Sequence, residues 1–296
     1  METKVCIIGA GPGGATAALQ LAQLGVECIV VDKAIFPRDK VCGDGLSGKV
    51  LTLLERIDKG IGQRLQQAMF KADSWGVTFV APNRIGMDIP YRPNYQEDKT
   101  DPRGFVCKRI DFDNFLVDEL KRRPEIRLFE GVSIDKYELQ ADGYLLSSKD
   151  GSFQVKADIV IAANGAHSAF TKEVAGIKME PEHYVAGIRA YYKGISGLHE
   201  DNFIELHFLK NMLPGYLWIF PLPNGEANVG VGMLSNTARN KKVNLKQLML
   251  NTIATDPVMK ERFKNAELTG SIDGYGLPLG SKKRKLHGER YMLVGD

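Results

Sequence analysis

The chain opens with VCIIGAGPGG at residues 5–14, an apolar run that passes into a series of glycines. Gly9, Gly11 and Gly14 in this run have the spacing G-x-G-x-x-G. Apolar residues then recur at helical spacing as far as Gly25, and a second apolar run, CIVV at residues 28–31, ends on Asp32. Strand, glycine turn, helix, strand and acid follow one another as in a dinucleotide-binding unit, so we expect an ADP moiety to bind here.

Each part of this pattern has a physical reason. Gly9 allows a tight turn, Gly11 lets the backbone approach a pyrophosphate, and Gly14 lets the helix pack closely on the strand. The phosphates would meet free amide groups at the positive end of the helix dipole. Asp32 can accept hydrogen bonds from both hydroxyls of an adenosine ribose and would repel a 2′-phosphate. The site therefore favours FAD or NAD over NADP.

The composition is that of an ordinary globular protein, with 44% hydrophobic and 25% charged residues among 296. A formal net charge of +3 is too small to indicate a nucleic-acid partner. The four cysteines lack the spacing of a metal site and are typical of reduced cytoplasmic thiols. The fingerprint begins too close to Met1 for a signal peptide, and no apolar run approaches a membrane span. We expect a cytoplasmic protein without a metal site, and contact with a membrane surface is left open.

The loop KAIFPRDKVCGDGLS at residues 33–47 is a candidate for function, because long ordered loops beside nucleotide-binding units often have one. Arg38 could meet phosphates or form ion pairs. Gly43 and Gly45, on either side of Asp44, permit a backbone path in close contact with a flat ring system. Cys42 lies in the loop and not in a predicted core strand, and a structural role is favoured for it over a chemical one.

Further along the chain, Arg109 comes just before a helix that we expect to begin near Asp111. Arg109 could reach a cofactor phosphate or ribityl chain, or it could pair with Asp111 or Asp113. Residues 126–160 predict short strands joined by glycine turns. The last of these runs, DIVIA at residues 158–162, precedes Asn164-Gly165 and should rejoin the sheet that carries the cofactor.

After Gly176 four alternating segments predict an antiparallel sheet with its own core: residues 184–192, 202–209, 215–222 and 227–234. In GYLWIFP at residues 215–221, period two puts Tyr216, Trp218 and Phe220 on one face. Gly230 and Gly232 recur at alternating positions, which weakens a strand unless something approaches it closely. Plain sheet packing would also account for these residues, but we favour a wide, apolar, flat-walled pocket.

Several motifs together resemble the FAD-dependent oxidoreductases of the p-hydroxybenzoate hydroxylase fold, and most closely their geranylgeranyl reductase branch. The fingerprint with Asp32 is shared widely. The loop FPRDKVCGDGLSG at residues 36–48 and the strand GYLWIFP at 215–221 are much more specific to this branch. Further matches are Arg109 before Phe112-Asp113, the run NGAHS at residues 164–168 and the closing Gly295-Asp296.

The resemblance implies an α/β fold (α+β overall). A Rossmann-like FAD-binding domain with a parallel sheet and a β-meander would span residues 1–73, 104–178 and 276–296. An antiparallel-sheet substrate domain would span residues 74–103 and 179–275. The family continues past its Gly-Asp motif, so we expect this chain to be truncated at the C-terminus.

The resemblance also implies non-covalent FAD and a set of site residues. In the family, the Cys42–Gly45 loop lies beside the flavin ring, Cys42 is a candidate catalytic residue, and Asp296 holds the ribityl chain. Asn164 stands where the family usually has Asp, which preserves shape but removes a charge. The implied cofactor contacts are Gly9, Gly11, Pro12, Gly13, Gly14, Asp32, Lys33, Arg38, Cys42, Gly43, Asp44, Gly45, Arg109, Val132, Asn164, Gly165 and Asp296. The implied substrate pocket is Tyr216, Trp218, Phe220 and Pro221.

The function that the resemblance implies is reduction of carbon–carbon double bonds in a geranylgeranyl-type lipid by hydride from reduced flavin. Only one G-x-G-x-x-G is present, so electrons would come from transiently docked NAD(P)H or from a ferredoxin-like protein. A monooxygenase or halogenase is an alternative, although the W-x-W-x-I-P strand of halogenases is absent. An electron-transfer flavoprotein to quinone is another alternative. A plain NAD dehydrogenase fits poorly, because no suitable His or Lys-Tyr arrangement is evident.

Overall fold

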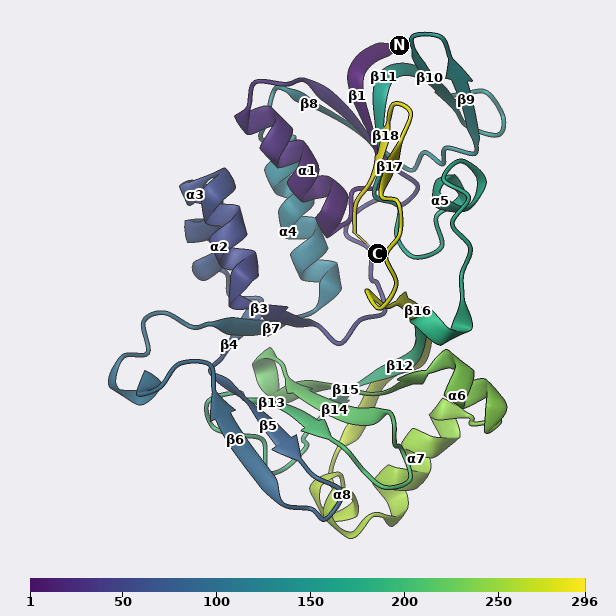
Figure 1. Cartoon of the computed structure of the whole chain (residues 1–296). Helices are drawn as coiled ribbons and strands as arrows, with labels where there is room; N and C mark the ends of the chain where they lie inside the picture. The colour runs from purple at the N-terminus through teal and green to yellow at the C-terminus, as the bar shows by residue number, and fades with distance from the viewer. Residues whose placement is uncertain (296) are drawn as a thin grey trace.

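The computed structural model describes residues 1–295 and shows two sheet-based bodies joined by a small third sheet (Figure 1). Asp296, which was predicted to hold the ribityl chain, lies outside the described residues. The eight α-helices recorded for the described residues are α1 Pro12–Gln23, α2 Gly48–Ile57, α3 Lys59–Gln66, α4 Arg109–Lys121, α5 Ala169–Glu173, α6 Ser235–Asn240, α7 Leu245–Thr255 and α8 Pro257–Arg262.

The first body is built on an eight-stranded sheet. Its main path runs β17-β18-β11-β1-β2-β8, with β10 and β9 branching from β11 as a meander. The pairs of β1 with β2 and β11, of β2 with β8 and of β11 with β18 are parallel. The bounds are β1 Glu2–Ile8, β2 Cys28–Asp32, β8 Ile126–Glu130, β9 Lys136–Gln140, β10 Gly143–Ser147, β11 Gln154–Ala162, β17 His287–Gly288 and β18 Tyr291–Leu293.

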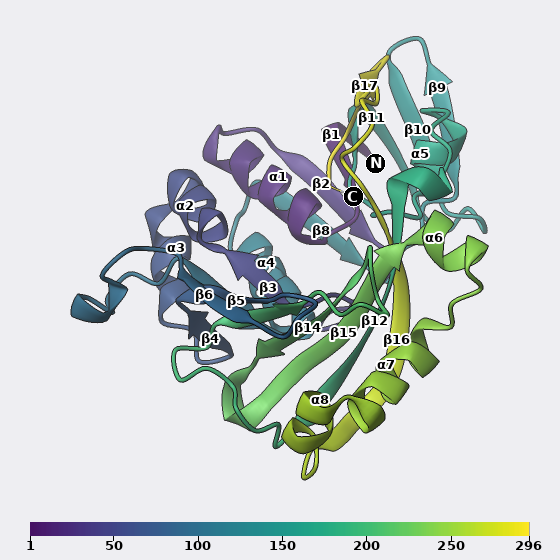
Figure 2. The same cartoon turned by 60° about the horizontal axis from the view of Figure 1, so that its bottom comes forward.

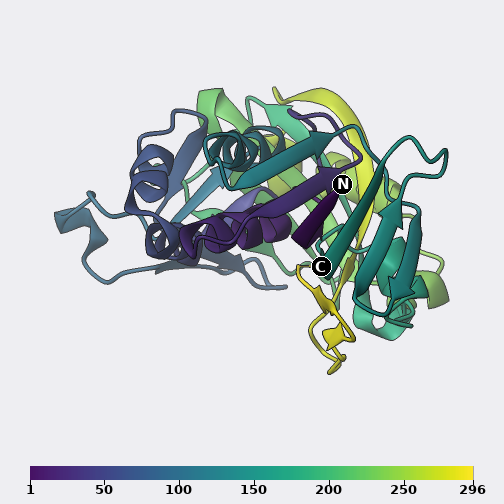
Figure 3. The same cartoon turned by 90° about the horizontal axis from the view of Figure 1, so that it is seen from above.

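Alternate side chains of β1 and β2 point to opposite faces of the sheet and so belong to two separate hydrophobic cores. Val5, Ile7 and Val30 pack against α1, α2, α3 and α4. Cys6 and Ile8 of the same strand β1 face the meander side together with β10 and α5. This period-two burial on both faces is what an apolar strand in a parallel sheet requires. Figure 3 shows the yellow C-terminal segment on the teal meander side, away from the blue-violet helices α2 and α3.

The second body is a seven-stranded sheet in the order β16-β12-β15-β14-β13-β5-β6. Helices α7 and α8 cover its outer face (Figure 2), where Met249 and Met259 are wholly buried. The opposite face looks toward the first body. The bounds are β5 Gly76–Val80, β6 Gly86–Pro90, β12 Tyr184–Lys193, β13 Ile204–His207, β14 Tyr216–Pro221, β15 Glu226–Leu234 and β16 Glu267–Pro278.

Two features of this sheet differ from the sequence-based expectation. The pair β13–β5 is parallel, so the sheet is antiparallel except at this one junction. The two strands come from distant parts of the chain, and no hairpin constrains their direction. The long strand β16 was not predicted, because Gly270, Gly274 and Gly276 interrupt its alternation. It crosses the predicted domain boundary at residues 275 and 276, and the division of the chain into two domains stays a prediction.

A three-stranded sheet, β3-β7-β4, lies where the two bodies meet (Figure 1). Its strands are β3 Gly45–Ser47, β7 Gly104–Cys107 and β4 Lys71–Ser74. The strand β3 continues directly from the Cys42–Gly45 loop, so this sheet holds one end of the loop in place. Among residues 1–295, none of the helices combines the length and apolar composition needed to cross a lipid bilayer.

Candidate functional site

In the glycine turn between β1 and α1, the packing of the chain requires glycine at two positions but not at the third. Gly9 has φ +105°, and a Cβ added there would lie 2.5 Å from the Ala163 carbonyl oxygen. A Cβ on Gly14 would overlap the Gly9 carbonyl oxygen. Gly11 is extended (φ −64°, ψ 177°), and the nearest atom to an added Cβ is Arg38 Nη2 at 3.6 Å. Packing within the chain therefore explains Gly9 and Gly14, while the space above Gly11 suits a ligand.

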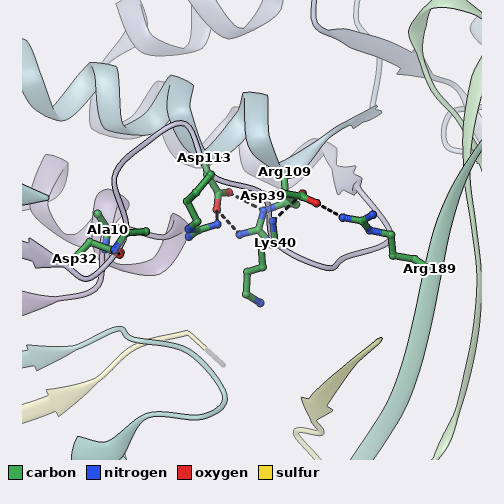
Figure 4. A network of polar contacts seen from close by, with 9 residues as sticks. Ala10, Asp32, Asp39, Lys40, Arg109, Asp113 and Arg189 are labelled. Carbon is green, nitrogen blue, oxygen red and sulfur yellow. Dashed lines mark hydrogen bonds and ion pairs between the residues drawn. The ribbon is translucent and has the colours of Figure 1, made fainter. Parts of the chain in front are cut away.

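Asp32 lies beside this turn, as the fingerprint predicted. Its Oδ2 accepts a hydrogen bond from the Ala10 N–H at 2.7 Å, and its Oδ1 accepts one from the Ala34 N–H at 2.8 Å (Figure 4). Val132 is held at the same place, because its N–H donates to the Asp32 carbonyl at 2.9 Å. Each carboxylate oxygen keeps a lone pair for a ribose hydroxyl. The neighbouring Lys33 is exposed.

Two arginines share one buried carboxylate next to the turn (Figure 4). Asp113, with no exposed surface, accepts from Arg38 at 2.7 Å and from Arg109 at 2.6 and 2.8 Å. Burial alone would lower the pKa of Arg109, but the Asp113 carboxylate holds it above its ordinary value. Two positive charges against one negative leave a net positive charge near the N-terminus of α1. That arrangement suits a diphosphate.

The Cys42–Gly45 loop packs against the second sheet. A Cβ added at Gly43 or Gly45 would lie 3.2 or 3.1 Å from Cε2 of Phe220. The flat ring that approaches these glycines from within the chain is therefore that of Phe220. Cys42 is half-buried, whereas the other three cysteines are fully buried. Burial raises the pKa of Cys6 to about 12 and that of Cys28 to about 11, so these two are inert thiols.

Asp44, in the middle of the loop, is wholly buried and adopts φ +66°. Its Oδ2 accepts hydrogen bonds from Asn228 Nδ2 and from the Tyr191 hydroxyl, both at 2.8 Å. Its Oδ1 has no hydrogen-bond partner among the described residues. Burial raises the pKa of Asp44 to about 6, although the Asn228 and Tyr191 hydrogen bonds and the nearby Arg189 charge lower it. Asn228, Tyr191 and Arg189 were missed as site residues, because single polar residues within alternating strands give no local signal.

The aromatic strand β14 alternates as predicted. Leu217 and Ile219 are buried against the helices, and Tyr216, Trp218 and Phe220 lie on the face toward the first body. The ring centroids of Trp218 are 6.1 Å from Tyr216 and 6.3 Å from Phe220. Pro221 has the parity of Ile219 and is buried, so it does not share the wall of the other three.

The glycines of β15 do not leave the expected empty slot. A Cβ on Gly230 would overlap the Trp218 ring, and one on Gly232 would lie 3.6 Å from Trp218 Cζ3. The group that approaches these glycines closely is thus a side chain of the neighbouring strand. The Trp218 ring covers the two glycines, so the ring and not the glycine backbone forms the wall at this place.

Asn164 and Gly165, at the end of β11, line a cavity of about 1050 Å³ together with Val294 and Gly295. The Oδ1 of Asn164 is buried without a hydrogen-bond partner in the described part of the chain. An unpaired buried acceptor favours a ligand that donates to it. The basic residues Lys282, Lys283 and Arg284 line the same cavity.

The residues present fit FAD. The space above Gly11, the shared positive charge of Arg38 and Arg109 and the carboxylate of Asp32 would hold its ADP half, and Asn164 offers an unpaired acceptor. The individual contacts with FAD stay predictions.

Comparison with known proteins agrees with this chemistry. The family described as FAD binding domain matches residues 2–257, which is most of the chain. Fold and site together define a flavin-dependent oxidoreductase whose cofactor is FAD.

The similar proteins narrow this class. The menaquinone reductase of Mycobacterium tuberculosis is 28% identical over 302 residues, covering all of this chain and 70% of that protein. Digeranylgeranylglycerophospholipid reductase 1 of Methanothermobacter thermautotrophicus is 30% identical over 301 residues, with the same coverage. The chain belongs to the FAD binding domain family, in its geranylgeranyl reductase-like branch, and the resemblance drawn from the sequence is confirmed.

Solved structures show the same fold. A geranylgeranyl bacteriochlorophyll reductase-like protein from Thermoplasma acidophilum has a TM-score of 0.80 at 20% identity, covering 99% of this chain and 70% of its own. A myxobacterial chondrochloren halogenase has a TM-score of 0.79 at 20% identity, covering 99% of this chain and 68% of its own. At these identities the comparison shows the fold alone.

Proposed function

We propose that this protein reduces carbon–carbon double bonds in the prenyl chain of a lipid or quinone, with electrons held on FAD. The observation that carries the proposal is a continuous apolar row on the inner face of the second sheet. Strand register aligns Trp218 with Leu206, Leu206 with Phe79, and Phe79 with Met87. All four are at least partly exposed, and Met87 at the far end is 58% exposed.

The length of this row suits an extended hydrocarbon chain. It runs from Trp218 on β14 to Met87 on the edge strand β6, which is three strand spacings or about 14 Å. Residues directly opposite each other in register share one face of the sheet, so the row carries no polar side chain between Trp218 and Met87. At its inner end the row meets Phe220, which packs on the Cys42–Gly45 loop.

In this reaction reduced FAD would supply the hydride, and a proton that comes ultimately from solvent would complete the addition of two hydrogens to the double bond. Arg38, Arg109 and the amides at the start of α1 would bind its diphosphate. The aromatic wall positions the prenyl chain and excludes water from the reacting carbons. Names of the similar proteins, a digeranylgeranylglycerophospholipid reductase and a menaquinone reductase, support a prenyl substrate. NAD(P)H or a ferredoxin-like donor, a cytoplasmic location and contact with a membrane surface stay predictions.

The test is anaerobic. The FAD-loaded chain is reduced with dithionite, mixed with a geranylgeranyl glycerophospholipid or menaquinone in detergent, and followed by the return of flavin absorbance. We expect reoxidation together with a lipid product that has gained two hydrogen atoms per reduced double bond. Oxygen uptake with a hydroxylated or halogenated product, and no anaerobic reoxidation by either lipid, would instead support the monooxygenase or halogenase alternative.

A matched pair of variants tests the apolar row. Met87→Lys places a charge at its far end, where the side chain is exposed and the fold tolerates the change. Asp88→Lys alters the next residue, whose side chain points to the opposite face. We expect Met87→Lys, but not Asp88→Lys, to slow reoxidation by geranylgeranyl lipids while leaving reoxidation by shorter geranyl analogues unchanged. Equal effects of the two variants would contradict the placement of the chain along this row.

A further inference from the structure

The side chain of Asn228 joins the Cys42–Gly45 loop to the aromatic wall. Asn228 is wholly buried on β15. Its Nδ2 donates to the Cys42 carbonyl oxygen at 2.7 Å and to Asp44 Oδ2 at 2.8 Å, and its Oδ1 accepts from Trp218 Nε1 at 2.9 Å. Trp218 can only donate and the Cys42 carbonyl can only accept, so just one orientation of the amide satisfies its neighbours. The amide therefore cannot flip without breaking these hydrogen bonds.

Trp218 is held at two places by this arrangement. Its indole N–H is bound to Asn228, and its six-membered ring lies across the backbone of Gly230. The side chain is half-exposed, so the surface it presents belongs to the apolar row described above. A change in the position of Asn228 would tilt the ring and alter the wall that a prenyl chain contacts.

Asp44 is the charged group at the other end of the connection. Tyr191 and Asn228 both donate to its Oδ2, and burial and the Asp44 charge raise the pKa of Tyr191, so this hydroxyl keeps its proton. The other charged or titratable groups that face Asp44 are Asp39 in the loop, Cys107 on β7 and Arg189 on β12. Loss of the charge on Asp44 would weaken both hydrogen bonds that its Oδ2 accepts, because bonds to an ionised acceptor are the stronger ones.

We propose that Asp44 is a positioning residue: through Asn228 it holds the Trp218 ring in place, so that one carboxylate fixes both the loop beside FAD and the wall that binds the substrate. Asp44 acts through Asn228 and touches neither reacting carbon. The substrate named here rests on the proposed function, whereas the link between Asp44 and Trp218 does not.

The direct test is ¹⁹F NMR of the FAD-loaded chain labelled with 5-fluorotryptophan. The sequence has two tryptophans, so Trp75 is an internal reference for Trp218. Since the pKa of Asp44 is raised to about 6, we expect the Trp218 resonance to shift with a midpoint near pH 6 while the Trp75 resonance stays constant. In Asp44→Asn the shift should disappear. Asp273→Asn is the matched control, because Asp273 contacts Arg189 but is bonded to neither Asn228 nor Trp218, and it should keep the transition.

A second variant keeps the test decisive if Asp44→Asn does not fold. The Tyr191 hydrogen bond lowers the pKa of Asp44, so Tyr191→Phe should move the midpoint to higher pH. With the geranylgeranyl lipid as substrate, Asp44→Asn should raise KM about tenfold and change kcat less, as expected for lost binding that is uniform along the reaction. A Trp218 resonance that does not titrate in the wild-type chain, or that titrates identically in Asp44→Asn or Tyr191→Phe, would overturn the inference. Failure to reduce any prenyl lipid would overturn the proposed function and leave the NMR result standing.

Discussion

The substitution Gly11→Ala tests whether glycine at this position is required for FAD binding or for the stability of the fold. The backbone at Gly11 has φ −64° and ψ 177°, which any L-residue can adopt. A new methyl group would lie 3.6 Å from Arg38 Nη2, an ordinary van der Waals distance, and would meet no other atom within 4 Å among the described residues. The same substitution at Gly14 would drive a methyl group into the Gly9 carbonyl oxygen.

The two substitutions should therefore differ in their effects on the stability of the fold and on the affinity for FAD. Gly11→Ala should leave the free energy of unfolding unchanged or raise it by about 0.4–1 kcal/mol, because alanine restricts the unfolded chain more than glycine does. The methyl group would occupy the space predicted for the pyrophosphate, and overpacking of this kind costs about 1–3 kcal/mol. The Kd for FAD should therefore rise about 5- to 150-fold. Gly14→Ala should lose both stability and FAD binding.

Two measurements check this prediction. Urea unfolding of the apoprotein reports stability, and quenching of FAD fluorescence on titration with apoprotein reports the Kd. Gly11→Ala with wild-type affinity for FAD would refute the assignment of the space above Gly11 to the pyrophosphate. A loss of stability equal to that of Gly14→Ala would show that the fold itself requires glycine at this position.

Three further predictions follow from the buried charges and the packing of the loop. Asp113→Asn removes the carboxylate that Arg38 and Arg109 share, and unpairing buried charges should cost about 3 kcal/mol of unfolding free energy. Thermal unfolding followed by circular dichroism should show a lower Tm, and a cost below about 1 kcal/mol would contradict the burial of this network. Asp44 has a folded-state pKa of about 6, above its unfolded value, so folding favours its protonated form. As the pH rises from about 4 to about 6, the free energy of unfolding of the wild-type chain should therefore fall by up to about 3 kcal/mol relative to that of Asp44→Asn. Urea-unfolding measurements that give the same pH dependence for both chains would contradict the raised pKa of Asp44. Phe220→Ala should cost about 1–2 kcal/mol, less than a fully buried phenylalanine, and should speed hydrogen exchange of the loop amides at residues 42–45. Unchanged exchange there would mean that Phe220 does not hold the loop.

Much of the first body could be read from local signals. The glycine spacing, the apolar strands and the acid at residue 32 lie close together in sequence, so the strand, turn and helix that they form are decided by short-range sterics. The alternation at residues 215–221 predicted which side chains of β14 face inward. Both predictions needed only residues within one element or two adjacent ones.

Long-range contacts could not be read in this way. The partner of Arg109 was left open between a cofactor and two carboxylates, and the structure pairs it with Asp113, which Arg38 reaches from another part of the chain. The glycines at residues 43, 45 and 230 indicated a close approach, but the approaching groups are Phe220 and Trp218 rather than a ligand alone. A glycine reports that space is needed, and only the packed chain shows what fills it.

The sequence alone therefore determined the dinucleotide-binding unit, the alternation of the second sheet and the family, because each is written in neighbouring residues with a fixed period. The tertiary structure decided the parallel junction of β13 with β5, the buried Asp44–Asn228–Trp218 connection and the apolar row from Trp218 to Met87. The junction joins strands that are far apart in the chain, and a one-residue shift in its register would place Leu206 and Phe79 on opposite faces of the sheet. The Asp44–Asn228 contact likewise joins a loop near the N-terminus to a distant strand.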